Sequence, residues 1–123
     1  MTKISKIAVI DDDGSVRDAL SGLVRSMGMA AIGYASAADF ISRTGYTDVD
    51  CIVTDVQMPG MSGVELLELL RKERHDVPVI LVTAYPAAAT RVRAMAAGAA
   101  YFLSKPFNGN EMVLCIEQVL AAA

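Results

Sequence analysis

The 123-residue chain has no tryptophan, a single histidine, only two cysteines and no long apolar run. Two cysteines are too few for a disulfide framework, and Cys51 and Cys115 lie in or beside apolar segments, so we expect buried thiols in a reducing, cytoplasmic compartment. No apolar run approaches the length that spans a membrane, and the short run at 7–10 is no secretory signal. The sequence therefore argues against a secreted or membrane-bound protein.

Positive charge is not in excess either. The chain has 11 Lys and Arg against 14 Asp and Glu, a formal net charge of -3. Because nucleic-acid binding requires a broad basic face, we expect no direct nucleic acid binding by this domain. Hydrophobic residues make up 54% of the chain, which at this length suffices for one sizeable core. We therefore expect a single domain over residues 1–123.

Short apolar runs recur along the chain at similar intervals. Four are nearly continuous, as in strands that are covered on both faces of a parallel sheet, and they lie at 7–10, 51–54, 79–82 and 101–104. A weaker fifth run at 30–34 is a candidate edge strand.

The segments between these runs have the apolar spacing of helices. The first, 16–27, has a single apolar face, and the fourth, 87–97, is rich in alanine and stops at Gly98. Capping pairs predict the starts of the other helices as well as the first: Ser15 with Asp18, Ser36 with Asp39, Ser62 with Glu65, and Asn108 with Glu111. Alternating strands and helices predict an α/β fold, a doubly wound five-stranded parallel sheet with helices on both faces.

Acidic side chains follow two of the predicted strands, at the end where such sheets bind ligands. Asp11, Asp12 and Asp13 come directly after the first strand, and Asp55 ends the third. With strand order 2-1-3-4-5 the first and third strands are neighbours, so Asp11, Asp12 and Asp55 converge in one crevice. Clustered carboxylates need a neutralising cation, and hard oxygen ligands suit Mg²⁺.

A plainer interpretation is that these aspartates only end strands and cap helices. We favour that interpretation for Asp13, as a cap of the first helix. For Asp11, Asp12 and Asp55 it requires three coincidences at the ligand-binding end of the sheet, so a metal site is the better prediction.

Thr83 and Lys105 directly follow the fourth and fifth predicted strands at the same edge. A threonine hydroxyl can donate to an anionic oxygen, and a lysine supplies a compact charge suited to phosphate. Singly, each is more often a strand-end residue or a solvated charge. Together with a metal and a carboxylate they indicate phosphoryl transfer to that carboxylate, with Asp55 as the acceptor.

Four segments of the chain, in order, resemble the receiver domain of two-component response regulators. They are 9–13 (VIDDD), 53–63 (VTDVQMPGMSG), 78–84 (PVILVTA) and 98–107 (GAAYFLSKPF). The resemblance covers the whole chain, implies the flavodoxin-like fold of CheY with strand order 2-1-3-4-5, and within the family is strongest to FixJ-like receivers.

The resemblance implies a role for each acidic residue. Asp55 would accept a phosphoryl group from a sensor histidine kinase. Mg²⁺ would be bound by Asp12, Asp55 and the backbone carbonyl of Gln57, and Asp11 would hold a metal-bound water.

The resemblance also implies a conformational switch. Lys105 would pair with the phosphoryl group, Thr83 would move to hydrogen-bond it, and Phe102 would change rotamer in concert. The Lys105–Pro106 peptide bond would be cis, and Gln57 and Tyr85 stand at positions that influence the lifetime of the phosphoryl group.

The switch would act on partners of the domain. The fourth helix with the following strand and helix would form the phosphorylation-dependent partner or dimer face. The regulated output would be transcription, with no output domain within 1–123. The chain would catalyse its own phosphorylation and dephosphorylation at Asp55 but turn over no external substrate.

Two other classes of protein share parts of this pattern. A haloacid-dehalogenase-type Mg²⁺-dependent phosphatase also uses an aspartate nucleophile with Thr and Lys, but typically has a second Asp two residues further on, where this chain has Gln57. A flavodoxin-like cofactor binder needs a Ser-, Thr- and Gly-rich loop after the first strand, where the acidic run 11–13 would repel a phosphate.

Overall fold

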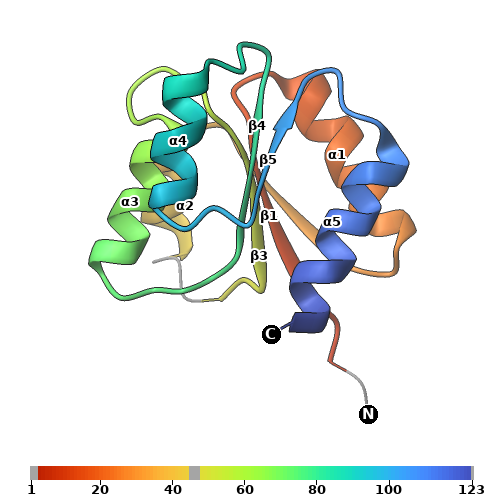
Figure 1. Ribbon diagram of the computed structural model, residues 1–123. Coiled ribbons are helices and arrows are strands. Elements are labelled where there is room, and N and C mark those ends of the chain that lie inside the picture. Colours follow the sequence, from red (N-terminus) through yellow and green to blue (C-terminus); the bar gives the residue numbers. More distant parts are fainter. Residues whose placement is uncertain (1–2, 45–47, 123) are drawn as a thin grey trace.

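The computed structural model describes residues 3–44 and 48–122, and within them five strands alternate with five helices (Figure 1). The elements are β1 (Lys6–Ile10), α1 (Gly14–Ser26), β2 (Ala30–Tyr34), α2 (Ala37–Thr44), β3 (Cys51–Asp55), α3 (Gly63–Lys72), β4 (Val79–Thr83), α4 (Ala88–Ala96), β5 (Tyr101–Ser104) and α5 (Gly109–Ala122). None of these helices is both long enough and apolar enough to cross a membrane.

All the strands pair in parallel, in the order β2-β1-β3-β4-β5. This confirms the predicted doubly wound sheet, including the weak run at Ala30–Tyr34, which is an edge strand. The register brings the strand ends level: Ile10 pairs with Thr54, Asp55 with Val82, and Thr83 with Ser104. Polar residues at the carboxyl ends of these strands therefore share one edge.

Helices cover both faces of the sheet, with α1 and α5 on one side and α2, α3 and α4 on the other (Figure 1). β3 and β4 are buried along their whole length, which explains their continuous apolar runs. Alternate residues of a strand point to opposite faces, so Ile7 and Val9 pack in the cluster with α1 and α5, whereas Ala8 and Ile10 join the cluster under α2 and α3.

The first helix begins one residue after Asp13, so the predicted capping box of Ser15 and Asp18 is wrong. The Asp13 carboxylate accepts hydrogen bonds from the backbone N–H groups of Ser15 at 2.9 Å and Val16 at 3.4 Å. Ser15 therefore lies within the first turn, and its backbone N–H is one of the groups being capped. This confirms the role that the sequence favoured for Asp13.

The other predicted helix starts are confirmed. Ser62 and Glu65 form a reciprocal capping box at the start of α3, with bonds of 3.1 and 2.9 Å. The Ser36 hydroxyl accepts the backbone N–H of Asp39 before α2, and the Asn108 side chain accepts backbone N–H groups at the start of α5.

Helix α4 differs from the other helices because no side chain caps its start. It begins after Ala87, which provides no side-chain cap, and Ala94 is its one buried residue. The chain leaves the helix through Gly98, whose φ of 95° suits a residue without a side chain, as the sequence predicted.

Candidate functional site

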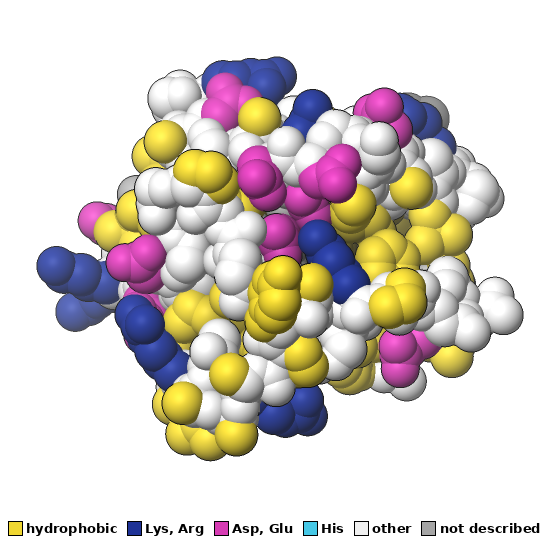
Figure 2. Space-filling view, turned by 90° about the horizontal axis from the view of Figure 1, so that it is seen from above, with side chains coloured by type: hydrophobic (Ala, Val, Ile, Leu, Met, Phe, Trp, Pro, Cys, Tyr) yellow, Lys and Arg dark blue, Asp and Glu magenta, His cyan; other side chains and the backbone are white. Residues whose placement is uncertain are grey.

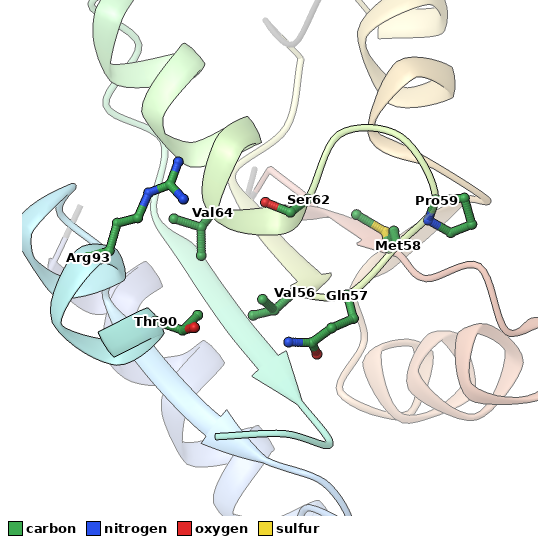
Figure 3. Close-up of a pocket in the computed structure, with 8 residues that line it drawn as sticks. All are labelled: Val56, Gln57, Met58, Pro59, Ser62, Val64, Thr90 and Arg93. Atoms are coloured by element: carbon green, nitrogen blue, oxygen red, sulfur yellow. The ribbon is translucent and has the colours of Figure 1, made fainter. Parts of the chain in front are cut away.

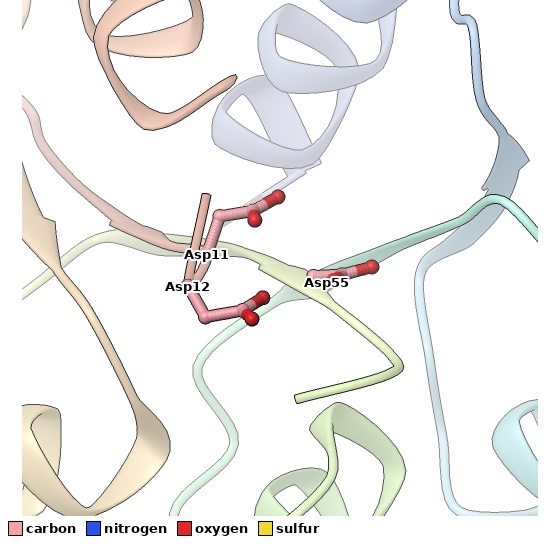
Figure 4. A group of neighbouring side chains, drawn as sticks. All are labelled: Asp11, Asp12 and Asp55. Carbon is pink, nitrogen blue, oxygen red and sulfur yellow. The ribbon is translucent and has the colours of Figure 1, made fainter. Parts of the chain in front are cut away.

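Three carboxylates meet at the carboxyl ends of β1 and β3 (Figure 4). Asp11 and Asp12 follow β1 directly, and Asp55 is the last residue of the neighbouring strand β3. One carboxylate oxygen from each lies within 4.8 Å of the others. Asp11 and Asp55 are buried, whereas Asp12 is exposed. The strand order thus brings together the residues that the sequence expected to converge.

Lys105 reaches the same cluster from the loop after β5. Its Nζ lies 2.9 Å from Oδ2 of Asp11 and 3.4 Å from Oδ1 of Asp55. The Lys105–Pro106 peptide bond is cis, as the resemblance implied. Figure 2 looks onto this edge of the sheet and shows acidic side chains gathered beside a basic one near its centre. One ammonium group faces three carboxylates, so the cluster keeps an excess of negative charge.

Both burial and this excess of negative charge affect the ionisation of the site. Burial raises the pKa of Asp55, Lys105 opposes this shift, and the charges of Asp11 and Asp12 add to it. Burial alone would lower the pKa of Lys105, but its hydrogen bond to Asp11 and the charges of Asp11 and Asp55 prevail and raise it. The site therefore favours additional positive charge.

The donor set fits a divalent cation. All three groups offer hard carboxylate oxygens, and their separation allows one ion to contact an oxygen of each. Asp12 lies on the exposed side, where water can complete the coordination shell, as Mg²⁺ prefers.

Asp11 is held by contacts that sequence reasoning missed. Its Oδ1 accepts the backbone N–H of Asp13 at 2.9 Å, and its backbone carbonyl accepts Nη1 of Arg17 at 2.7 Å. The stem of Arg17 passes so close to Gly33 that a Cβ there would lie 3.2 Å from two of its carbons. Arg17, six residues after Asp11, has no motif that would single it out.

Thr83, at the end of β4, is completely buried and has two hydrogen-bond partners. Its hydroxyl donates to Oε1 of Gln57 at 2.5 Å and accepts the backbone N–H of Tyr85 at 3.0 Å. The resemblance implied a role for the backbone carbonyl of Gln57, but the contact of its side chain with Thr83 was not predicted.

Phe102, the other expected switch residue, is buried on β5. The guanidinium carbon of Arg91, from α4, lies 5.6 Å from the centre of its ring, within the range of a cation–π contact. The neighbouring Tyr101 packs with the other core cluster, and its hydroxyl donates to Gln118. The two aromatic residues thus face opposite sides of the sheet.

An open cavity of about 560 Å³ adjoins the site between the loop after β3, the start of α3 and helix α4 (Figure 3). Its lining consists of Val56, Gln57, Met58, Pro59, Ser62, Val64, Thr90 and Arg93. Gln57 therefore contacts Thr83 on one side and open space on the other.

Comparisons with known proteins agree on one family. A family model described as the response regulator receiver domain matches residues 7–117. The transcriptional regulatory protein FixJ of Azorhizobium caulinodans is 41% identical over 114 residues, which are 93% of this chain and 54% of FixJ. The chain spans about half the length of the curated relatives it matches.

Solved structures show the same likeness. A CheY-like receiver domain protein from Methanospirillum hungatei superimposes with a TM-score of 0.91 at 26% identity, covering 98% of this chain and 96% of that one. The crystal structure of FixJ-N gives a TM-score of 0.87 at 32% identity, covering 99% of this chain and 98% of its own.

Proposed function

We propose a role for each site residue from one premise: the chain belongs to the response regulator receiver domain family of two-component signal transduction. In this proposal Asp55 accepts a phosphoryl group from a sensor histidine kinase. The observation that supports it is the meeting of Asp55 with two further carboxylates and Lys105 at the ligand-binding edge of the sheet. The haloacid-dehalogenase alternative is not favoured.

Asp55 suits the acceptor role better than its two neighbours. The Asp11 carboxylate already accepts hydrogen bonds from a backbone N–H and from the Lys105 ammonium group, and Asp12 is exposed. Asp55 is buried and has Lys105 at 3.4 Å, close enough to pair with a phosphoryl group added there. An oxygen of Asp55 would attack phosphorus while the phosphorus–nitrogen bond to the kinase histidine breaks, and the histidine would take a proton and leave as neutral imidazole.

Mg²⁺ would be held by the carboxylates of Asp12 and Asp55 with the backbone carbonyl of Gln57, and by Asp11 through a metal-bound water. Bound there, it would neutralise charge on the phosphoryl oxygens. Lys105 would pair with the phosphoryl group, and its distances to Asp11 and Asp55 support this role.

Thr83 and Phe102 would couple phosphorylation of Asp55 to a change in the surface formed by α4, β5 and α5. Thr83 would turn its hydroxyl to the phosphoryl group, and Phe102 would change rotamer and alter its contact with Arg91 of α4. Val92 and Met95 of α4 are 70% and 45% exposed, so α4 offers apolar groups to a partner or a second copy at the proposed face of α4, β5 and α5.

The output that we propose is regulation of transcription, as in the relative FixJ. The chain would act by changing its contacts and not by turning over an external substrate. We propose a cytoplasmic location, where the buried, free thiols of Cys51 and Cys115 would stay reduced.

Phosphorylation by acetyl phosphate with Mg²⁺, followed by intact mass, tests the acceptor. The wild type is expected to gain one phosphoryl group, and Asp55→Asn to gain none. Asp13→Asn is the matched control, because asparagine also caps helices and Asp13 lies outside the carboxylate group. An undiminished gain in Asp55→Asn would contradict the proposal, as would no gain in the wild type.

Beryllofluoride with Mg²⁺ tests the partner face. A dimer in solution is expected only in its presence, and an unchanged monomer would remove dimerisation from the proposal.

A further inference from the structure

We propose that Gln57 is a positioning residue whose side chain holds the Thr83 hydroxyl in its resting orientation. It thereby sets the equilibrium between the resting and the activated arrangement of the domain. This inference rests on the proposed function, because it takes Thr83 as the group that moves to the phosphoryl oxygen. It concerns the side chain of Gln57 alone, since the backbone carbonyl is the part assigned to the metal.

The geometry makes Gln57 and a phosphoryl group competitors. Thr83 is completely buried, and its hydroxyl has a single proton, which is donated to Oε1 of Gln57 at 2.5 Å. The hydroxyl oxygen also accepts the backbone N–H of Tyr85 at 3.0 Å. A hydrogen bond to a phosphoryl oxygen requires the same proton, so Thr83 has to leave Gln57 when it forms one.

The surroundings of Gln57 make this contact easy to release. Gln57 stands two residues after Asp55 in the loop after β3, and its side chain reaches across to the end of β4. The residue as a whole is exposed and lines the open cavity below α4 (Figure 3). Once Thr83 turns away, water can satisfy the freed amide oxygen, so the Gln57 contact opposes activation only by the net strength of one hydrogen bond.

That net strength sets the size of the expected effect. An intramolecular hydrogen bond of ordinary strength shifts an equilibrium by roughly twofold to twelvefold. Loss of the acceptor should therefore shift the resting population toward the activated arrangement by that factor, and should tighten the binding of a phosphoryl analogue equally.

Gln57→Met is the variant that tests this inference. Methionine has a similar length but only a weak acceptor, and the substitution leaves the backbone carbonyl in place. Thr83→Val keeps the shape of the side chain and removes the hydroxyl. If Gln57 acts through Thr83, then Gln57→Met has an effect in the wild type and none in Thr83→Val.

The backbone amide of Tyr85 provides the readout, because it donates to Thr83 Oγ1. We would record its ¹H–¹⁵N position in each variant, first without ligand and then during a titration with beryllofluoride at fixed Mg²⁺. In Gln57→Met without ligand, the signal should lie displaced along the path that the wild type follows on titration. Its half-saturating beryllofluoride concentration should be lower by roughly twofold to twelvefold.

The outcomes separate the inference from the function on which it rests. If the wild type does not respond to beryllofluoride, the proposed function fails. If the wild type responds and Gln57→Met titrates at the same concentration, the function stands and the inference is overturned. An equal effect of Gln57→Met in the Thr83→Val background would also overturn it, because Gln57 would then act by another route.

Discussion

Gly63 is the residue at which helix α3 comes closest to the candidate acceptor. It is the first residue of α3, and its backbone N–H donates to the carbonyl of Val56 at 3.0 Å. A Cβ on Gly63 would lie 2.3 Å from the backbone oxygen of Asp55 and 3.1 Å from Cδ2 of Leu81. Gly63→Ala therefore forces α3 and the end of β3 apart.

The size of the effect follows from what has to move. Real Cβ contacts are essentially never shorter than 3.0 Å, so the two backbones must separate by at least about 0.7 Å. Overpacking of a core costs about 1–3 kcal/mol, and the upper end applies because backbone in a fully buried strand has to yield. Alanine recovers at most about 1 kcal/mol through helix propensity. We expect a net loss of about 2 kcal/mol, or about 8 °C in Tm.

Thermal unfolding followed by circular dichroism measures this loss, and Gly22→Ala is the matched control. Gly22 lies inside α1, is exposed, and has no atom within 4 Å of a Cβ built on it. Alanine there should stabilise the domain by about 0.5–1 kcal/mol, so the same substitution should have opposite signs at the two positions. A Gly63→Ala protein as stable as the wild type would refute the close approach of α3 to Asp55.

Three further substitutions test the charge of the site and the helix starts. Burial raises the pKa of Asp55, so ionisation of its carboxyl group destabilises the folded state. The free energy of unfolding therefore falls as the pH rises from the unfolded-state pKa of Asp55 through its higher folded-state pKa. In Mg²⁺-free buffer Asp55→Asn should therefore have a higher Tm than the wild type at neutral pH, and this difference in Tm should vanish below the unfolded-state pKa of Asp55. A difference in Tm that does not change with pH would contradict this. Ser62→Ala should cost about 1 kcal/mol by removing the cap of α3, whereas Ser15→Ala should cost almost nothing because Asp13 caps α1, and equal urea midpoints for the two would argue against that assignment.

The fold and the meeting of the carboxylates were predictable because both depend on which residues end which strand. Continuous apolar runs identify buried parallel strands, and parallel strands bring their carboxyl ends to one edge. Asp11, Asp12 and Asp55 are therefore placed by chain position alone. The cap of α1 was harder to predict because Asp13 and Ser15 are both good caps, and the turn after β1 decides where the helix begins.

The contacts between side chains could not be predicted in the same way. The hydrogen bond from Thr83 to Gln57 depends on the rotamers of two residues in neighbouring segments, and a pattern of residue types does not determine rotamers. The same holds for Arg17, whose guanidinium reaches back to the carbonyl of Asp11. Such contacts depend on rotamers that are decided only when the chain is folded.

Helix α4 is the element that we expect to respond most when the site changes. Ala94 is its one buried residue, whereas α3 buries Gly63, Val64, Leu66, Leu67 and Leu70. Burial of a single methyl group contributes little, and the bond of Arg93 to Glu68 is exposed, so α4 is held weakly. The guanidinium group of Arg91 packs over the ring of Phe102, so a change of the Phe102 rotamer removes one of the few contacts of α4. A small free energy at Thr83 can then shift a whole helix, because little else opposes the shift.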